Sequence, residues 1–457
     1  MSTRSVVLHG HFYQPPRENP WTGAIDQEKT AAPDHDWNAR INRECYAPLG
    51  SIPIGAIDSD PPRINAYSFV SFDVGPTLLS WLEREARPTL EAMVQGDRAS
   101  RKRLGHGNAI AMPYHHLILP LCSRRDKTTE VRWGIADFKR VFGRDPAGMW
   151  LPETAVDRET LDVLAEEGIA FTVLAPHQVA APPSSGVAGR VRTSGGRSIA
   201  VFAYDGALSH DVAFGQLLKD AVLWEKQLIA EAKGRQVLSL AMDGETFGHH
   251  HVYADLALGA LLRRLATLRA VRLENFASAL AAHPEGPDLD LVAPSSWSCI
   301  HGVERWRADC GCKMAPEQSS QQRWRTPLRA AVDWLAGEVH GRFERAANGG
   351  DPWRRRDELG PGAVPAFPAD DAGRLAEMER SVLRAMTSCG WFFDDFAGLE
   401  GRQSLRYAAH AIALAGDDAP RLEAGFLDCL ADAMSNDAAA GSARDFYLNQ
   451  IAPERPA

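Results

Sequence analysis

The chain has 457 residues, with 50 Lys and Arg against 59 Asp and Glu, which gives a formal net charge of −9. Its 45% hydrophobic and 24% charged residues are typical of a folded globular protein and exclude a disordered chain, a collagen-like fibre and a coiled coil. The excess of acidic residues argues against a nucleic-acid partner, because a protein that binds nucleic acid normally has a basic face. The 12 Trp and 15 His are unusual counts, and the tryptophans must serve either a core or a binding surface.

No apolar run reaches the roughly 20 residues that a membrane helix needs, so we expect no membrane partner. The apolar run within residues 1–9 is too short for a signal peptide. Seven cysteines in a long chain do not resemble the disulfide framework of a secreted domain. We therefore expect a cytoplasmic protein.

Short apolar runs alternate with helical patterns through the first 280 residues. Strands are predicted at 6–8, 67–72, 109–112, 149–151, 169–174 and 237–242, with a hairpin at 190–204. Helices are predicted at 76–94, 127–142, 158–167 and 208–232. This alternation indicates an α/β fold with a parallel sheet. Because no glycine-rich phosphate loop follows the first strand, we favour a barrel over an open nucleotide-binding sheet.

The alternation of strand and helix patterns stops after residue 285, and the composition of the sequence changes. A breaker cluster at 284–287 is followed by a segment rich in Trp and Cys at 297–324. Helical patterns then run over 326–347 and from 372 to the end. The sequence therefore predicts a catalytic barrel in residues 1–285 and a mainly helical C-terminal region in 286–457.

Polar side chains follow two of the predicted strands at the end where a parallel barrel carries its reactive groups. His11 and Gln14 lie beside rigid prolines directly after the first strand. Glu153 follows the strand at 149–151 and a proline. The purely structural alternative for the first segment is a turn with a capped histidine. The structural alternative for Glu153 is an acid in the first turn of the next helix.

A third polar segment ends the most apolar strand, at 237–242. Asp243 and Glu245 are separated by one glycine, and His249 begins a run of three histidines. Strands of a parallel sheet are buried on both faces, so a carboxylate at their exit is costly unless it is solvated or paired. Two carboxylates at two strand ends, Glu153 and Asp243, are the minimum equipment for glycoside cleavage.

Four segments resemble, in order, the motifs of glycoside hydrolase family 57. They are His11-Phe12-Tyr13-Gln14-Pro15-Pro16, Gly105-His106-Gly107-Asn108-Ala109, Met149-Trp150-Leu151-Pro152-Glu153 and Met242-Asp243-Gly244-Glu245-Thr246-Phe247-Gly248. Residues 296–306 and 387–393 resemble the subgroup of that family with a C-terminal domain of unknown function.

The resemblance implies an incomplete (β/α)7 barrel that acts on α-glucans or maltooligosaccharides with retention. It implies Glu153 as nucleophile, Asp243 as general acid and base, and His11 as a substrate-site residue, with carboxyl groups about 5 to 5.5 Å apart. Amylase, 4-α-glucanotransferase and branching enzyme share these motifs. The further substrate-binding candidates are Gln14, His115, Trp150, Glu245, His249, Trp297 and Trp306.

The tryptophans can be sorted by their position along the chain. Candidates for a sugar-stacking surface are Trp21, Trp150, Trp297 and Trp306. The helical patterns predict core positions for Trp81, Trp133, Trp224 and Trp334.

Cysteines and histidines permit other interpretations. Residues that invite a zinc site are Cys299, His301, Cys310, Cys312 and Cys389. Because Cys310 and Cys312 form a C-x-C rather than the usual C-x2-C, we favour free core cysteines and expect neither metal nor cofactor. The histidine pair at 115–116 and the run of three histidines at 249–251 suggest instead a metal-dependent polysaccharide deacetylase on a similar barrel. A non-catalytic carbohydrate-binding protein is the third alternative.

Overall fold

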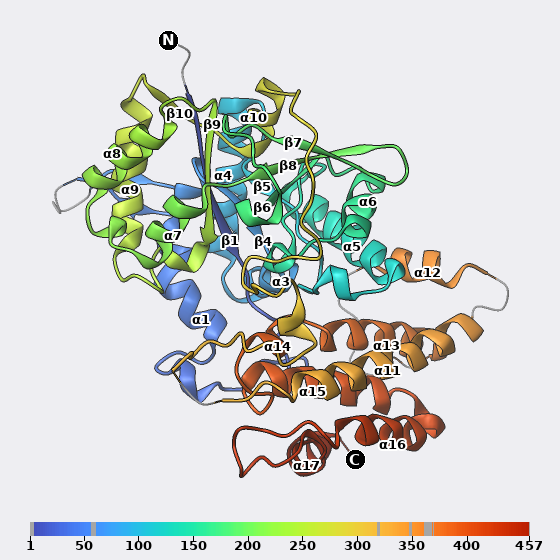
Figure 1. Cartoon of the computed structure of the whole chain (residues 1–457). Helices are drawn as coiled ribbons and strands as arrows, with labels where there is room; N and C mark the ends of the chain where they lie inside the picture. Colours follow the sequence, from blue (N-terminus) through green and yellow to red (C-terminus); the bar gives the residue numbers. More distant parts are fainter. Residues whose placement is uncertain are drawn as a thin grey trace. The chain divides into compact units, whose positions relative to one another are not determined.

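The computed structural model describes residues 4–55, 61–317, 320–346, 350–360, 368 and 370–456. The chain forms two compact units, whose elements are labelled in Figure 1. Unit 1 comprises Met1–Gln14, Gln27–Pro113 and Asp137–Ala293. Unit 2 comprises Pro15–Asp26, Tyr114–Ala136 and Pro294–Ala457, so two segments from the first third of the chain belong to the C-terminal unit.

Strand β1 (Arg4–Phe12) is the centre of the parallel sheet in unit 1, and its residues are almost all buried. It pairs in parallel with β9 (Val237–Asp243), β4 (Ser71–Val74) and β10 (Val271–Leu273). In turn β4 pairs with β5 (Ala109–Ile110). The runs of apolar residues that predicted β1 and β9 reflect a sheet covered on both faces, whereas the short β10 was not predicted.

A second sheet of unit 1 contains β6 (Phe171–Leu174), β8 (Ser198–Ala203) and β7 (Gly189–Arg192). The β7–β8 pair is the predicted antiparallel hairpin, whereas β6 and β8 are parallel. Parallel bridges from Ala111 to Met149 and from Gly148 to Phe171 connect the two sheets. The strands therefore follow the order of the predicted incomplete barrel, although ladders among the described residues do not close it.

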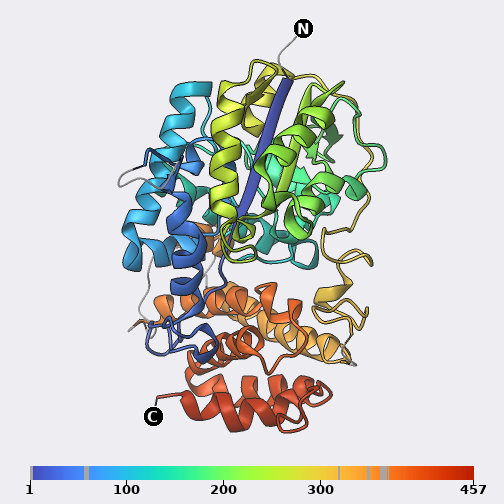
Figure 2. The ribbon, with the colours of Figure 1, turned by 90° about the vertical axis from the view of Figure 1, so that its left-hand side faces the viewer.

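Helices pack around these sheets, and Figure 2 shows β1 in dark blue with light-blue and yellow-green helices beside it. Those of unit 1 are α1 (Trp37–Ile41), α2 (Ala47–Leu49), α3 (Pro76–Glu85), α4 (Arg87–Leu104), α6 (Arg158–Glu166), α7 (Gly206–Phe214), α8 (Ala221–Ala232), α9 (Ala254–Thr267) and α10 (Phe276–Ala282). A short antiparallel pair is formed by β2 (Ile52–Pro53) and β3 (Arg63–Ile64). Helix α5 (Arg124–Phe142) contributes to both units.

Two long predicted helices are each divided in the structure. The helix predicted at 76–94 breaks at Ala86, whose backbone is not helical (φ −138°, ψ 48°). Pro88 then lies in the first turn of α4, where a missing N–H costs nothing. The helix predicted at 208–232 breaks at Gly215, which is also not helical (φ −92°, ψ −149°). Helical periodicity survives across such breaks, so the sequence pattern alone does not reveal them.

Unit 2 is helical, as predicted for the C-terminal region. Its helices besides α5 are α11 (Arg325–Arg345), α12 (Pro352–Leu359), α13 (Asp371–Ala385), α14 (Cys389–Phe392), α15 (Leu399–Ala413), α16 (Ala419–Leu430) and α17 (Ala443–Phe446). Helix α11 packs against α13 and α16, and α13 packs against α15. Within the described parts of the chain, no helix has both the length and the apolar character needed to cross a bilayer.

A buried ion-pair network lies in the helical unit. Arg356 is fully buried, and its Nη1 lies 2.9 Å from Asp126 Oδ1 and 2.8 Å from Glu379 Oε2. His340 Nδ1 lies 2.9 Å from Glu379 Oε2 and its Nε2 lies 3.5 Å from Asp126 Oδ2. Burial lowers the pKa of His340, but the two carboxylates outweigh it and raise the pKa to about 10. The ring is therefore a cation at neutral pH.

Most of the tryptophans predicted for the core are buried in the structure. Trp81, Trp133 and Trp224 are buried, which confirms three of the four predictions, and Trp334 is partly exposed. Two of the four sugar-stacking candidates, Trp150 and Trp306, are also fully buried.

Candidate active site

The register of β1 aligns three polar side chains at the carboxyl end of the sheet. His11 is opposite Asp73 on β4 and opposite Asp243 on β9. Because the three strands are parallel, their side chains emerge at the same edge of the barrel. This edge is where parallel barrels carry catalytic groups.

Asp73 bridges two histidines of β1. Its Oδ2 lies 2.8 Å from His11 Nδ1 and its Oδ1 lies 3.1 Å from His9 Nε2, with Asp73 fully buried. Burial raises the pKa of Asp73, but the two rings outweigh it, so the pKa is lowered and the group is a carboxylate. Burial likewise lowers the pKa of His11, and the charge of Asp73 overcomes this effect and raises it. Asp73 thereby orients His11 and favours its protonated form.

Trp150 supports these histidines from one side. Its ring stacks on His9 at a centroid distance of 4.8 Å and on His11 at 5.4 Å. The Trp150 side chain is completely buried. In this structure Trp150 therefore packs the histidines in place and offers no exposed face to a sugar ring.

Glu153 lies on a strained turn. Its backbone is in the left-handed region (φ 56°, ψ 18°), and Thr154 also has a positive φ of 49°. Such conformations cost about 1 to 3 kcal/mol each and persist only where the surroundings impose them. The buried Gln178 supplies that constraint: its Nε2 donates to the Thr154 carbonyl oxygen and its Oε1 accepts from Thr154 Oγ1, both at 2.8 Å.

Asp243 is the ionisable group of the site whose pKa is most informative. Burial raises its pKa, His11 opposes this effect, and the negative charges of Glu245 and Glu153 raise it further, to about 6. An ordinary aspartate has a pKa near 3.9. A carboxyl group with a pKa near 6 can donate and take back a proton close to neutral pH.

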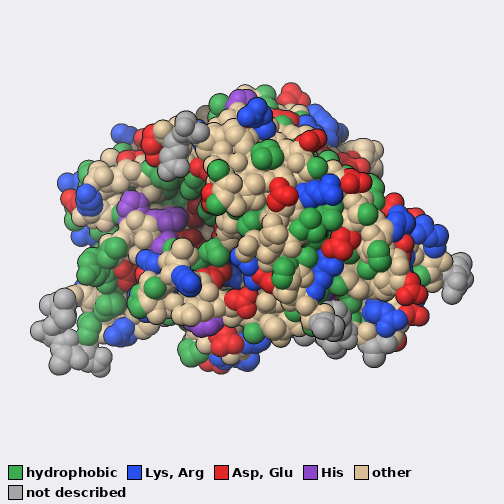
Figure 3. Space-filling view, turned by 90° about the horizontal axis from the view of Figure 1, so that it is seen from below, with side chains coloured by type: hydrophobic (Ala, Val, Ile, Leu, Met, Phe, Trp, Pro, Cys, Tyr) green, Lys and Arg blue, Asp and Glu red, His purple; other side chains and the backbone are tan. Residues whose placement is uncertain are grey.

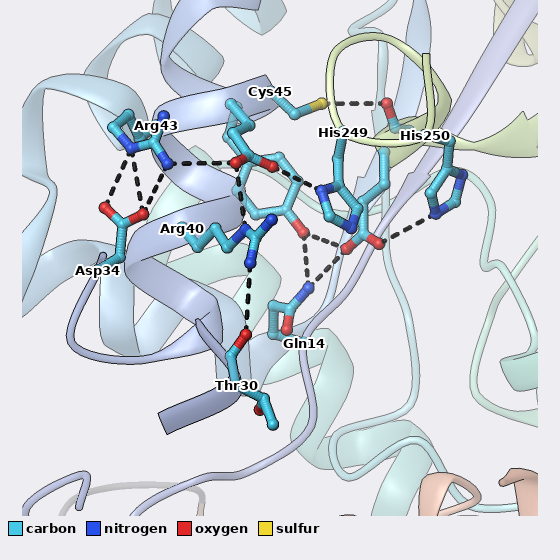
Figure 4. A network of polar contacts seen from close by, with 12 residues as sticks. Gln14, Thr30, Asp34, Arg40, Arg43, Cys45, His249 and His250 are labelled. Carbon is cyan, nitrogen blue, oxygen red and sulfur yellow. Dashed lines mark hydrogen bonds and ion pairs between the residues drawn. The ribbon is translucent and has the colours of Figure 1, made fainter. Parts of the chain in front are cut away.

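Glu245 is held by a hydrogen-bond network that Figure 4 shows from close by. Its Oε1 accepts hydrogen bonds of 2.6 Å from both Gln14 Nε2 and Tyr46. Its Oε2 lies 3.8 Å from His250 Nε2. Burial raises the pKa of Glu245 above its ordinary value, while the bond from Tyr46 limits the increase. Glu245 therefore has a fixed position from which its charge acts on Asp243.

His249 bonds a different carboxylate. Its Nδ1 lies 2.6 Å from Oε2 of Glu44 (Figure 4). The other carboxylate oxygen of Glu44, Oε1, accepts a hydrogen bond from Arg40 Nε at 3.1 Å. Gly248 has a φ of 149°, and a Cβ there would lie 2.2 Å from the Glu44 carbonyl oxygen. The glycine thus permits the close approach of this loop to residues 40–46. His250 is exposed, and Figure 3 shows histidine side chains gathered at one place on the surface beside acidic ones.

Three sequence-predicted site residues belong to unit 2. His115 is fully buried, with its Nδ1 2.7 Å from Glu130 Oε1, and Trp306 is fully buried as well. Trp297 is partly exposed. Neither His115 nor Trp306 presents a surface to a ligand in this structure.

Three residues of the site were not among the sequence candidates, namely Tyr46, Asp73 and Gln178. His250 was considered only within the histidine run at 249–251 that suggested a deacetylase. Asp73 carried a usable signal, since it directly follows the strand predicted at 67–72, as Asp243 directly follows the strand predicted at 237–242. Tyr46 and Gln178 act through hydrogen bonds that span 199 and 24 positions, and no local pattern marks them.

The histidines that suggested a deacetylase have other partners. His116 Nδ1 lies 2.6 Å from Ser388 Oγ and His251 Nε2 lies 2.7 Å from the Ala213 carbonyl oxygen. Of the residues that the structure describes, only one group of His, Cys, Asp and Glu has metal-binding geometry, and it lies in unit 2 at 299–312.

The sequence matches two family models. The model described as glycosyl hydrolase family 57 matches residues 8–282, which is more than half of the chain. The chain belongs to glycosyl hydrolase family 57. The predicted resemblance is thereby confirmed, and this family 57 member is an enzyme of the glycoside hydrolase and transglycosylase class. A domain of unknown function (DUF3536) matches residues 321–360 and 368–456, as expected for the predicted subgroup.

Solved structures share the fold of this family 57 chain at low sequence identity. An exo-type maltose-forming amylase from Pyrococcus sp. ST04 has a TM-score of 0.70 and 16% sequence identity, and the match covers 94% of this chain and 84% of the amylase chain. A branching enzyme from Thermococcus kodakaraensis has a TM-score of 0.57 and 15% identity, and the match covers 99% of this chain and 96% of the enzyme's chain. A 4-α-glucanotransferase from Thermococcus litoralis has a TM-score of 0.58 and 15% identity, and the match covers 91% of this chain and 60% of the transferase chain. No curated protein matches the sequence significantly.

Proposed function

We propose that the protein cleaves or transfers α-glucosidic bonds of α-glucans and maltooligosaccharides by a retaining double displacement. Glu153 is the nucleophile, and Asp243 is the general acid and base. The observation that carries this assignment is the pKa of Asp243, which burial and two neighbouring carboxylates raise to about 6. A carboxyl group with a pKa raised in this way is typical of the general acid of a glycosidase.

In the first step, Glu153 attacks the anomeric carbon while Asp243 protonates the glycosidic oxygen. The bond to the leaving sugar breaks, and a glycosyl ester forms on Glu153. In the second step, Asp243 takes a proton from water or from an acceptor hydroxyl, which attacks the same carbon and releases Glu153. The net configuration is retained because the carbon is inverted twice.

The neighbouring groups support these roles. The left-handed backbone of Glu153 is clamped by Gln178, so little reorganisation is needed to aim the nucleophile. His11, with its pKa raised by Asp73, places a positive charge near both carboxylates and is suited to binding sugar hydroxyls. Membership of family 57 and the α-glucan enzymes among the structures of similar fold favour an α-glucan as substrate.

The decisive experiment is incubation of the full chain with amylose and with purified maltooligosaccharides, followed by product analysis. Shorter chains with new reducing ends indicate hydrolysis, redistributed lengths indicate transfer, and new α-1,6 linkages indicate branching. Binding of these sugars without any product would overturn the proposal in favour of a non-catalytic carbohydrate-binding protein.

The nucleophile is tested by Glu153→Gln, which should lower turnover by at least about 10³-fold with an unchanged fold. Glu166→Gln, on the exposed end of α6, is the matched control and should keep full activity. A fluorinated glucosyl donor that slows the second step should leave a covalent sugar on the peptide that contains Glu153. A label on another acid would show that the assignment is wrong.

A further inference from the structure

A segment of unit 2 whose described residues form no long helix or strand gathers three cysteines and one histidine. It lies between α10 and α11 along the chain and is gold in Figure 1. One ligand atom from each of these residues lies within 4.8 Å of the corresponding atoms of the others; they are Cys299, His301, Cys310 and Cys312. Cys389, the fifth residue of the sequence hypothesis, is not part of this group.

The separations are those of metal ligands and not of disulfides. Cys299 Sγ lies 4.0 Å from Cys310 Sγ and 3.8 Å from Cys312 Sγ. A disulfide requires about 2.05 Å between sulfurs. Around a tetrahedral zinc ion with Zn–S distances of about 2.3 Å, neighbouring sulfurs are about 3.8 Å apart.

The histidine fits the same geometry. His301 Nδ1 lies 3.6 Å from Cys312 Sγ. With Zn–N and Zn–S distances of about 2.1 and 2.3 Å, tetrahedral ligands of these two kinds are about 3.6 Å apart. These three separations are therefore close to those of tetrahedral zinc ligands, and all four ligand atoms lie within 4.8 Å of one another.

The backbone shapes the cluster. Gly311 has a φ of 81°, a conformation that L side chains rarely adopt, and it lets Cys310 and Cys312 turn toward one point. The backbone amides of His301 and Arg305 form hydrogen bonds with the thiol of Cys299. Amide donors of this kind orient sulfur ligands and stabilise their charge. The C-x-C spacing, which argued against zinc in the sequence, is thus compatible with a shared ligand point.

We propose that Cys299, His301, Cys310 and Cys312 bind one zinc ion in a closed structural site. Three thiolates and one imidazole are soft and borderline ligands that suit zinc, and four protein ligands complete its tetrahedral shell. No coordination position remains for a substrate, so the ion has no catalytic part. Three thiolates on a divalent ion leave one net negative charge, which the nearby Arg325 guanidinium balances.

The ion would stabilise a loop that is otherwise held by a few polar contacts. Arg305 Nη2 donates to the Phe392 carbonyl oxygen at 2.7 Å, and Arg325 Nη1 donates to the Cys312 carbonyl oxygen at 2.8 Å. Met314 N donates to Asp394 Oδ1 at 2.8 Å. These bonds attach the loop to the end of α14, to the start of α11 and to the turn after α14, and zinc would cross-link the two ends of the loop, 299–301 and 310–312.

The first test is the metal content of the full chain, purified under reducing conditions without chelator. Elemental analysis should find one zinc ion per chain, and a mercurial thiol reagent should release it to a colorimetric zinc indicator. Cys310→Ser and Cys312→Ser should each lower the zinc content at least several-fold. Cys429→Ser, which removes a thiol outside the cluster, is the matched control and should retain one ion.

A second measurement covers variants that fail to fold. Wild-type protein stripped with chelator should regain thermal stability on adding zinc chloride alone, and added zinc should protect Cys299, Cys310 and Cys312 from alkylation, but not Cys429. Cobalt(II) in place of zinc should give the intense visible absorption of a tetrahedral thiolate site.

Three results would overturn the proposal. They are fully reduced protein that neither contains nor takes up stoichiometric zinc, equal zinc content in wild type and in both cysteine variants, and a native mass 2 Da low with a disulfide mapped within 299–312. All three readouts are independent of catalytic activity, so they leave the proposed α-glucan function to its own test.

Discussion

Gln178 and Thr154 exchange two hydrogen bonds of 2.8 Å, and this exchange fixes the turn that carries Glu153. The amide of Gln178 also accepts from the backbone N–H of Ala175 at 2.9 Å, so the clamp is anchored on both sides. Because Gln178 does not react, it is a positioning residue. Its contribution can be separated from that of the nucleophile.

Replacing Gln178 by Leu should lower kcat by about 10²-fold, because a displacement of the nucleophile by about 1 Å has that effect. KM should change far less, since the sugar-binding groups stay in place. Thr154→Val should give a similar but smaller loss, and the double variant should be no worse than Gln178→Leu. Steady-state kinetics on a maltooligosaccharide would measure this, and additive losses would show that the two residues act separately.

The pH dependence of activity should follow Asp243. Its protonated form is the acid, so kcat/KM should fall as the pH rises through about 6, the pKa of this group. Glu245→Gln removes a negative charge that raises this pKa, so the alkaline limb should move to lower pH. Glu44→Gln, in the same network but bonded to His249, should leave the limb in place. A limb that stays in place or moves upward in Glu245→Gln would contradict the role given to Glu245.

Asp73→Asn should destabilise unit 1 strongly. It leaves His9 and His11 buried without their carboxylate, and breaking a buried charge pair costs about 3 to 5 kcal/mol. Because the pKa of Asp73 is lowered in the folded state, wild type should lose this stability as the pH falls through that pKa, and the variant should not. Asp34→Asn, which breaks the more exposed pair with Arg43, should cost less than about 1 kcal/mol. Urea unfolding from pH 7 down to about pH 2 would test both, because the pH-dependent loss lies below about 3.9, the ordinary pKa of an aspartate.

His340 should make the helical unit sensitive to alkali. Its pKa is raised to about 10, so its contribution to stability is fully present below about pH 6.5 and is lost as the pH rises toward 10. His340→Gln should lower stability by about 3 kcal/mol at pH 7 and should flatten the decline between pH 7 and 10. His177→Gln, at an exposed position, should keep the wild-type decline. An equally steep decline in His340→Gln would show that another group titrates.

Sequence patterns predicted the barrel-like fold, the helical unit and the exit of β9, because apolar periodicity and strand exits are local. The strand predicted at 67–72 is shifted in the structure, where β4 spans Ser71–Val74. The patterns did not separate core from site tryptophans: Trp81 and Trp150 are both buried, although only the first lies in a helical pattern. Burial of Trp150 depends on stacking with His9 and His11, which come from 139 or more positions away in the chain. The pairing of Asp73 with His11 has the same origin, since it depends on the register between β1 and β4. Long-range register is what local patterns cannot supply.

Strand β1 also sets a condition on how the chain folds. Its parallel partners β9 and β10 begin at Val237 and Val271. More than half of the chain must therefore be synthesised before β1 can complete its hydrogen-bonded ladders. At translation rates of about 5 to 20 residues per second, that wait is roughly 13 to 50 seconds. During this time an apolar strand with unpaired edges is exposed to other chains. Recombinant yield should therefore depend on chaperone supply and growth temperature more than on the equilibrium stability of the finished protein.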